Sequence, residues 1–409
     1  MSAHRRPLVA LLSSTAFEGH RLYEQRLAEE LARDHDVLFV QPPTAVWTRR
    51  DGLRAGRGPV RAPRGVRVVT PWVPPASRRR GLHRLNAPVV ALTLLAACLR
   101  DGRRPRAVVT AQDVTGPLAR AARALGARTA FLVKDDYVAG AGLVGVPAAR
   151  LRAGRERSLD LADEVVVVSP RLLRLAAERG RTAHLVPAGA PEPVAAEGAA
   201  RAVAEGSAPG PAPGPAPEGE RPFAVFLGMV SDRLDLGWLE ELVRTGTDLV
   251  VVGPRQPTFT QDAAWQRLVA DPRVRWLGPR EAGEVAGVLA RARVGVMPYT
   301  LSEFNRASFP LKVLEYLAAG LPVVSSRLDA VEWLDAPGVR VVDDAAGFAA
   351  AVAELVAAGP SARGAGERRA FAAGHTWRER GRRWRELLGL DAPAAGGPAA
   401  GEPAAGARA

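Results

Sequence analysis

One stretch decides the fold of this chain, and it runs from Tyr299 to Ser326 as YTLSEFNRASFPLKVLEYLAAGLPVVSS. We expect a strand to end at its start, a helix to begin at the Ser-Phe-Pro step, and another strand to follow the Gly-Leu-Pro turn. Ser308 is a residue type that caps helices, Pro310 suits a first helical turn, and Gly320 can close a helix in a left-handed conformation. The stretch therefore predicts a strand–helix–strand unit.

The start of this predicted helix is a candidate anion site. The first N–H groups of a helix lack partners within the helix, and they lie at the positive end of its dipole. Ser308, Phe309 and Leu311 would contribute backbone N–H groups, whereas Pro310 cannot donate one. The side chain of Lys312 is close by in the sequence. These groups suit a phosphate or a pyrophosphate.

Glu315 follows Ser308 by seven residues, close to two helical turns, so the two residues share nearly the same helix face. Its carboxylate could hydrogen-bond a sugar hydroxyl, and a ligand with a phosphate end and a hydroxyl end suggests a nucleotide. The alternative is an ordinary amphipathic helix with a solvated Lys312–Glu315 pair. Of the 56 basic residues only Lys134 and Lys312 are lysines, so each can mark a place where a compact ammonium is needed.

Four pieces of the second half carry a resemblance to a known family. They are Phe226–Asp235, Leu249–Pro254, Val274–Gly278 and Pro298–Ser326. In order and spacing, they resemble the GT-B-fold glycosyltransferases, specifically the retaining family-4 group that uses nucleotide-sugar donors. The resemblance extends over roughly residues 7 to 388.

The chain departs from this family at one position. The family often carries Glu-x7-Glu; Glu315 fits the second glutamate, but Ala307 stands at the first. Similar branches with Asn-Arg-x-Ser-x-Pro-x-Lys before Glu-Tyr-Leu-Ala do without that glutamate. The sugar-contacting role is therefore open, and Glu303, Asn305 and the neighbouring Arg306 are the candidates.

The resemblance implies roles for further residues of the donor site. Arg233 and Lys312 would bind the donor diphosphate, Glu315 would bind the ribose, and Gly253 with Pro254 would let the base approach closely. It also implies a reaction with retention of anomeric configuration, without a metal ion or any other cofactor. Protein cations and helix N–H groups must then stabilise the charge of the leaving diphosphate.

Composition and charge limit the other functions. The chain has 409 residues, enough for two domains, and its net charge of +13 favours phosphate-rich partners. Only 5% of the residues are aromatic and the charge is not concentrated in one tail, so we expect no nucleic-acid partner. Cys98 is the single cysteine, which excludes an intrachain disulfide and a thiolate metal cluster.

The sequence gives no sign of a membrane span. The apolar run Leu8–Leu12 is too short for a signal peptide, and no stretch reaches the roughly 18 to 20 apolar residues that cross a bilayer. We expect a cytoplasmic protein. The apolar segment Asn86–Leu99 is predicted to be a buried core helix. Because arginines flank it on both sides, the alternative is a helix that docks on the anionic inner face of the cell membrane.

The first half alternates apolar strands with helices, which predicts a parallel sheet covered on both faces. We expect strands at residues 7–13, 35–41, 66–70, 107–111 and 128–133. Ligands bind beyond the carboxyl ends of such strands. The loops there include Ser14 to His20, in which Gly19 and His20 are candidate acceptor-loop residues.

The loop after residue 133 is the candidate catalytic loop. Lys134, Asp135 and Asp136 stand at a strand end where the family often places a catalytic or sugar-contacting polar residue, and we expect Asp135 or Asp136 to act near the reacting centre. A solvated turn is the alternative. Adjacent carboxylates can hold Mg²⁺, but the resemblance implies no metal. The GxGxxG match at Gly140–Gly145 does not follow a strand directly, so we do not expect a dinucleotide site.

The chain divides into five segments by composition. We expect an acceptor-side Rossmann-like domain over residues 1–193, an Ala/Gly/Pro linker over 194–220 and a nucleotide-sugar-binding domain over 221–362. A terminal helix over 363–390 would pack back on the first domain, as GT-B folds often have it, and a disordered tail would cover 391–409.

The sequence thus predicts a GT-B glycosyltransferase of the hexosyltransferase type. It would move a sugar from a nucleoside-diphosphate sugar to a lipid-linked, polysaccharide or small-molecule acceptor, in a setting such as cell-envelope or polysaccharide biosynthesis. One alternative is a nucleotide-sugar epimerase of the same fold. The other is a catalytically degenerate nucleotide-sugar-binding protein, which Ala307 suggests.

Overall fold

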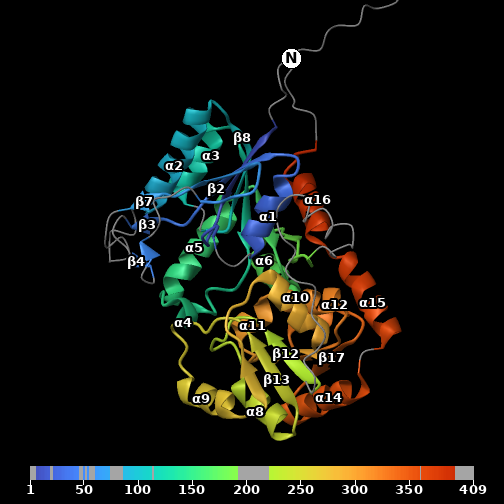
Figure 1. Ribbon diagram of the computed structural model, residues 1–409. Helices are drawn as coiled ribbons and strands as arrows, with labels where there is room; N and C mark the ends of the chain where they lie inside the picture. Colours follow the sequence, from blue (N-terminus) through green and yellow to red (C-terminus); the bar gives the residue numbers. More distant parts are fainter. Residues whose placement is uncertain are drawn as a thin grey trace, which may run out of the picture.

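The computed structural model describes residues 6–18, 22–45, 49–50, 53–54, 60–73, 86–112, 115–191, 221–359 and 361–391. Several predictions fall elsewhere: the acceptor-loop residues Gly19 and His20, the linker over 194–220, and the tail apart from Asp391 lie outside the described residues. The described residues form two large sheets, one above the other in Figure 1, and two short strand pairs.

The first sheet consists, within the described residues, of seven parallel strands in the order β11-β10-β9-β8-β1-β2-β6. Its strands are β1 (Leu8–Leu12), β2 (Asp36–Val40), β6 (Val66–Val69), β8 (Pro105–Thr110), β9 (Arg128–Val133), β10 (Glu164–Val167) and β11 (His184–Leu185). The helices of this half are α1 (Tyr23–Leu31), α2 (Asn86–Asp101), α3 (Gly116–Ala124), α4 (Ala141–Val144), α5 (Ala148–Leu161) and α6 (Pro170–Ala177). Beside them are the short pairs β3 (Thr44–Ala45) with β7 (Trp72–Val73), and β4 (Arg49–Arg50) with β5 (Leu53–Arg54).

The second sheet has six parallel strands in the part of the chain that the structure describes, in the order β14-β13-β12-β15-β16-β17. They are β12 (Phe223–Leu227), β13 (Asp248–Val252), β14 (Val274–Trp276), β15 (Val294–Met297), β16 (Val323–Ser326) and β17 (Val339–Val342). Its helices are α8 (Leu236–Arg244), α9 (Asp262–Ala270), α10 (Ala282–Arg291), α11 (Glu303–Ala307), α12 (Leu311–Ala319), α13 (Asp329–Leu334) and α14 (Ala345–Ala358), followed by α15 (Ala362–Ala373) and α16 (Trp377–Leu387).

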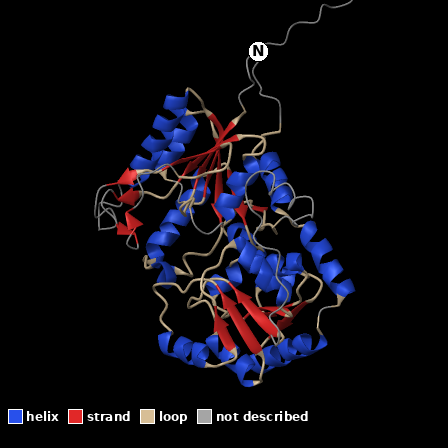
Figure 2. Cartoon of the chain, viewed as in Figure 1, coloured by secondary structure: helices blue, strands red, loops and turns tan. Residues whose placement is uncertain are grey.

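Continuous apolar runs explain the two sheets. Strands such as Leu8–Leu12 and Phe223–Leu227 are buried along their whole length, which is typical of parallel strands covered on both faces. Figure 2 shows helices on both sides of each sheet. The predicted fold class of two Rossmann-like parallel-sheet domains is confirmed. The predicted domain boundaries stay predictions.

The end of the chain differs from the single terminal helix that the sequence predicted. It forms two helices, α15 and α16, and Thr376 caps the second by accepting a hydrogen bond from the Glu379 N–H. Helix α16 packs on α1 of the first domain, where Trp384 Nε1 donates to the Tyr23 hydroxyl at 2.9 Å. The same hydroxyl donates to the Val186 carbonyl at 2.9 Å.

Among the described residues, no single helix is long and apolar enough to cross a membrane. One bent pair, α14 with α15, meets the same criteria of length and composition, with an angle of 117° between its helices.

Candidate functional site

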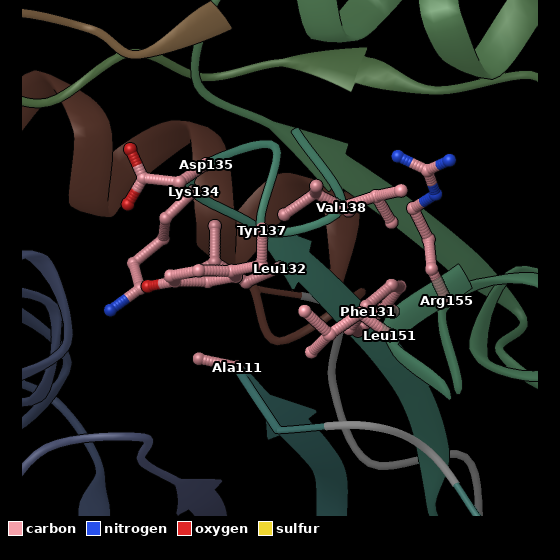
Figure 3. Close-up of a pocket in the computed structure, with 10 residues that line it drawn as sticks. Ala111, Phe131, Leu132, Lys134, Asp135, Tyr137, Val138, Leu151 and Arg155 are labelled. Atoms are coloured by element: carbon pink, nitrogen blue, oxygen red, sulfur yellow. The ribbon is translucent and has the colours of Figure 1, made fainter. Parts of the chain in front are cut away.

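Three residues that follow β9 line a cavity of about 60 Å³ at the carboxyl edge of the first sheet: Lys134, Asp135 and Tyr137. Figure 3 shows the Lys134 and Asp135 side chains on one side of this cavity and Arg155 on the other. The remaining walls come from Ala111, Phe131, Leu132, Val133, Val138 and Leu151.

Lys134 forms a buried ion pair with Glu24 of α1. Its Nζ lies 2.6 Å from Glu24 Oε1 and 3.1 Å from the Ser14 hydroxyl, which also donates to Glu24. Glu24 is 0% exposed. Burial raises the pKa of Glu24, but the Lys134 ammonium together with hydrogen bonds from the backbone and from Ser14 more than offsets this, so that the pKa lies below its ordinary value.

The sequence analysis missed Glu24 and Ser14. A signal was present, because Glu24 occupies the apolar face of α1 with Leu27, Ala28 and Leu31, at helical spacings of three, four and seven. A carboxylate on that face needs a cation as its partner. Lys134, 110 residues away, is the residue that supplies it.

Asp135 reaches the second domain. Its Oδ1 accepts a hydrogen bond from the Ser308 hydroxyl at 2.6 Å, and this hydroxyl also lies 3.0 Å from the Phe304 carbonyl. Ser308 is 4% exposed, so the contact is shielded from solvent on the Ser308 side. One predicted catalytic residue and one predicted diphosphate-binding residue therefore meet across the domain boundary.

Asp136 serves the turn itself. Its Oδ1 accepts from the backbone N–H groups of Val138 and Ala139 at 3.1 and 3.3 Å, and from Arg155 at 2.9 Å. The Asp136 side chain is 14% exposed. The structure therefore separates the two aspartates: Asp135 contacts the second domain, whereas Asp136 shapes the loop.

Tyr137 lies between these groups. Its ring centroid is 6.1 Å from that of Phe304. Burial raises the pKa of Tyr137 far above its ordinary value, and the nearby carboxylates of Asp135 and Glu24 raise it further. The phenol therefore keeps its proton and acts as a hydrogen-bond donor.

Helix α12 begins later than the sequence predicted. Its N-cap is Pro310, and Ser308 instead ends the short helix α11, which the sequence analysis did not foresee. Ser308 cannot cap α12 because its hydroxyl is directed to Asp135 and to the Phe304 carbonyl. Gly320 closes α12 in the left-handed conformation, with φ of 84°, as predicted.

Three N–H groups remain available at the start of α12. Within the described residues, the backbone N–H groups of Phe309, Leu311 and Lys312 donate no hydrogen bond. They lie at the positive end of the helix dipole, where an anion is stabilised.

Lys312 and Glu315 pair with each other. Lys312 Nζ lies 2.9 and 3.1 Å from the two carboxylate oxygens of Glu315, and the side chains are 17% and 20% exposed. The pair that the sequence offered as the alternative is thus present, but it is largely buried. A ligand that used both residues would have to separate them.

Arg233 is held by Asn305. Its Nε donates to Asn305 Oδ1 at 2.7 Å, and Asn305 Nδ2 donates to the carbonyls of Arg233 and Thr300. The guanidinium carbon lies 5.0 and 5.5 Å from the ring centroids of Phe304 and Tyr299, within the range of cation–π attraction. The guanidinium is thus oriented before any ligand arrives.

The predicted sugar-contacting residues are engaged in protein contacts. Asn305 is 1% exposed and both ends of its amide are in use, so here it positions Arg233. Glu303 pairs with Arg171 of α6, and Arg306 Nη1 lies 3.6 Å from Asp329. A sugar contact by Asn305 would require its hydrogen bonds to break, whereas the side chains of Glu303 and Arg306 are 62% and 33% exposed.

Ala307 has a packing role. It is 0% exposed, belongs to the apolar core of the first domain, and its carbonyl accepts a hydrogen bond from Ser169. A glutamate here would place a charge in that core. An alanine, rather than a glutamate, therefore suits position 307, where the two domains make an apolar contact.

Position 253 needs a glycine because the backbone at Gly228 lies against it. It has φ of 137°, and a Cβ at this position would lie 2.0 Å from the Gly228 carbonyl oxygen. Val230 N–H donates to the Pro254 carbonyl at 2.9 Å, so the same two loops are joined again. The predicted contact of Gly253 and Pro254 with a base remains a prediction.

The described residues contain no group of three or more His, Cys, Asp or Glu side chains that could hold a metal ion. The expectation of a reaction without metal remains a prediction. The GxGxxG match lies away from any strand end: β9 ends at Val133, and Gly140 instead packs closely against Phe304 of the second domain.

Comparison with known proteins identifies both halves. Residues 18–189 match the model of the glycosyl transferase 4-like domain, and residues 233–358 match that of the glycosyl transferases group 1. A curated relative, the putative teichuronic acid biosynthesis glycosyltransferase TuaH of Bacillus subtilis (strain 168), is 33% identical over 114 residues. That match covers 28% of this chain and 29% of the relative, so less than a third of the relative's length is matched.

Solved structures share the complete fold. Sucrose-phosphate synthase from Thermosynechococcus elongatus has a TM-score of 0.65 at 17% identity, covering 94% of this chain and 97% of its own. The UDP-forming α,α-trehalose-phosphate synthase from Burkholderia xenovorans has 0.64 at 15%, covering 93% and 100%. HepE from Anabaena in complex with UDP-glucose has 0.63 at 12%, covering 93% and 99%.

The two family models follow each other in the order of the two sheets, and the solved structures match the two-domain arrangement over nearly the whole chain. The chain belongs to the GT-B-fold glycosyltransferases of group 1.

Proposed function

We propose that this protein is a hexosyltransferase that moves a sugar from a nucleoside-diphosphate sugar to a hydroxyl of an acceptor. The observation that carries the proposal is the contact between Asp135 of the first domain and Ser308 at the start of α12. A carboxylate of the first domain lies beside a helix start of the second domain whose N–H groups have no partner among the described residues, which supports an acceptor side and a donor side at this contact. The described HepE structure contains UDP-glucose, so that nucleotide sugar is the first donor to test.

The donor diphosphate would lie at the start of α12. The N–H groups of Phe309, Leu311 and Lys312 would bind its oxygens, and the Arg233 guanidinium would stabilise the charge that grows as the diphosphate leaves. Lys312 would turn from Glu315 to a phosphate, which releases Glu315 for the ribose hydroxyls. No metal ion is needed in this arrangement, because helix N–H groups and two cations provide the stabilisation.

The acceptor would enter from the side of the first sheet. Asp135 would contact the transferred sugar, and Tyr137 would donate a hydrogen bond in the same cavity. We propose retention of configuration: the acceptor attacks the face that the diphosphate leaves, and the leaving phosphate takes the acceptor proton. The acceptor itself is proposed as a lipid-linked sugar, a polysaccharide or a small molecule, and TuaH supports a polysaccharide. A cytoplasmic location stays a prediction.

Calorimetric titration with UDP, GDP, ADP and TDP in the presence of EDTA tests the donor site. We expect one diphosphate to bind, and Glu315→Ala to weaken its binding on the order of tenfold, because a buried ribose hydroxyl loses its acceptor. Glu354→Ala is the matched control, since this glutamate of α14 pairs with Arg340 at the surface. If no diphosphate binds, or if both variants bind like the wild type, the donor site is misplaced.

Product analysis with UDP-glucose tests the reaction. We expect transfer to an added acceptor with the anomeric configuration retained, as proton NMR of the product reports. Asp135→Asn should lower kcat on the order of a hundredfold while UDP binding stays unchanged. An altered nucleotide sugar formed without an acceptor would indicate an epimerase, and UDP-glucose binding without any product would indicate a degenerate binding protein.

A further inference from the structure

Helix α2 has an apolar outer face. Among the described residues, its Leu99 and Leu92 are the two most exposed large apolar side chains, at 79% and 64%. Ala96, which is also exposed, lies between them, and spacings of three, four and seven residues place all three on one face. Figure 1 shows α2 on the outer side of the first domain, away from the second domain.

The opposite face of α2 packs against the core of the first domain. Val90, Leu94, Ala97 and Cys98 are buried in the core of the first domain, where they pack with residues of β1, β2 and β8. The inner face of α2 is thus fully used by the domain. The outer leucines are not part of that core, and they leave an apolar stripe of α2 open to solvent.

Two arginines lie where α2 ends: Arg100 is in its last turn, and Arg104 follows its last residue, Asp101, by three positions. Arg100 and Arg104 are exposed, and neither forms an ion pair with any described residue. The nearby acidic side chain Asp101 is already paired with Arg67, and Arg103 is paired with Asp36 at 2.6 Å. An apolar stripe followed by arginines that pair with no described acidic residue is the pattern of a helix that lies in a membrane interface.

We propose that the outer face of α2, formed by Leu92, Ala96 and Leu99, docks the protein on an anionic lipid bilayer, together with Arg100 in its last turn and Arg104 three residues beyond its end. The leucines would enter the boundary between headgroups and acyl chains, and the arginines would contact lipid phosphates. The net charge of +13 favours this partner over a neutral surface. Such docking does not depend on the proposed transfer activity.

The docking would also bring the membrane near the proposed site. Helix α2 ends just before β8 begins, so it runs antiparallel to the strands, and its first residue Asn86 lies toward the carboxyl edge of the first sheet. The same edge carries Lys134 and Asp135. A hydroxyl acceptor carried by a lipid would therefore reach the protein at the correct edge.

Vesicle co-sedimentation tests the proposal on the full chain. Wild-type protein should bind vesicles of phosphatidylcholine mixed with phosphatidylglycerol, bind phosphatidylcholine alone much more weakly, and lose binding as salt is added. Two double variants, L92E with L99E and R100E with R104E, should each lower binding on the order of tenfold or more. Trp333→Glu is the matched control: it is 46% exposed, lies on α13 of the second domain, and should bind like the wild type.

Three results would overturn the proposal. The first is equal binding of the wild type to neutral and anionic vesicles, and the second is unchanged binding of both double variants. The third is a dimer in light scattering that L92E with L99E dissociates, because the face would then be covered by a second copy of the chain. The altered residues are exposed, and equal melting temperatures would confirm that each variant is folded.

Discussion

Glu24 and Lys134 form an ion pair in which the carboxylate has no exposure to solvent. Replacing Glu24 with glutamine keeps the shape of the side chain but leaves the Lys134 ammonium, which is only 11% exposed, without its counter-charge. Loss of one partner of a buried pair costs about 3–5 kcal/mol. We therefore expect Glu24→Gln to lower the free energy of unfolding in urea by about that amount.

Glu29 provides the control for this substitution. It lies on the same helix and pairs with Arg26 at 3.3 Å, but its side chain is 25% exposed and that of Arg26 is 43% exposed. Exposed pairs contribute about 0–1 kcal/mol. If Glu24→Gln and Glu29→Gln unfold at the same urea concentration, the buried pair does not stabilise the domain.

The same pair predicts sensitivity to acid. The pKa of Glu24 in the folded protein lies below its ordinary value of 4.5, so the unfolded chain binds the proton more readily. The stabilisation is complete above the unfolded pKa and is lost as the pH falls through the folded pKa. The difference in melting temperature between the wild type and Glu24→Gln should therefore be constant near neutral pH and shrink below about pH 4.5. A difference that stays constant in acid would contradict the pairing.

Local sequence chemistry accounts for several individual residues but not for their partners. Gly320 was placed correctly because a left-handed helix end needs only local information. Ser308 was misplaced because its hydroxyl is used by Asp135, which is 173 residues away. This long-range hydrogen bond overrides the local capping preference of serine. The residues near Ser308 in the sequence give no signal of it.

At the scale of elements, β15 and α12 fit together through one glycine. A Cβ at Gly295 would lie 2.4 Å from the Tyr316 ring. The ring cannot move freely, because Tyr316 is 0% exposed and its hydroxyl accepts from the Leu227 N–H at 2.7 Å. Gly295→Ala should therefore destabilise the second domain by about 1–3 kcal/mol, as measured by thermal unfolding.

We expect the replacement of a second glycine by alanine to stabilise the protein. Gly366 lies within α15, and a Cβ there would meet no atom within 4 Å. Alanine favours a helix over glycine by about 0.5–1 kcal/mol, so Gly366→Ala should raise the melting temperature. A raised melting temperature in both variants would mean that the Tyr316 contact does not govern Gly295.

The strands were more predictable than the short helices. The strand expected at residues 128–133 is β9 itself, because a continuous apolar run bounded by polar residues is a local signal. Helix α11 has only five residues, too few for a periodic pattern. The order of the strands and the break between α15 and α16 depend on packing between distant segments, which no single stretch encodes.

At the scale of the whole molecule, helix α16 packs on helix α1 and stabilises the first domain. The Tyr23 hydroxyl accepts from Trp384 of α16 and donates to the Val186 carbonyl. Tyr23→Phe would leave both groups buried without this partner, at a cost of about 1–3 kcal/mol. We expect a lower melting temperature and an earlier change in tryptophan fluorescence during urea unfolding. Unchanged unfolding would show that α16 is held by apolar contacts alone.

The contact between the two domains could not be foreseen from the sequence. Arg174 of α6 lies 2.8 Å from Asp329 of α13, Arg171 pairs with Glu303, and Ser169 donates to the Ala307 carbonyl. These residues are ordinary in type, and only the folded chain brings them together. These contacts join the proposed acceptor side to the proposed donor side. A change in the distance between the two domains should therefore lower the activity more than the stability.

Gly140 allows a direct test of that separation. A Cβ at Gly140 would lie 2.3 Å from the ring of Phe304, which in turn lies 5.0 Å below the Arg233 guanidinium. Gly140→Ala should push the domains apart and displace Arg233, lowering kcat/KM for the donor on the order of tenfold or more. The melting temperature should change little, because contacts between domains adjust more easily than a core.

Gly142 is the matched control for Gly140, since it lies two residues further on, within α4, and a Cβ there would meet no atom within 4 Å. Small-angle scattering should show a larger radius of gyration for Gly140→Ala than for Gly142→Ala, and only the former should lose activity. If both variants keep full activity, the Phe304 ring moves aside without consequence and the spacing of the domains does not control Arg233. If both lose it equally, the substitutions act through the backbone of α4 and its N-cap rather than through Phe304.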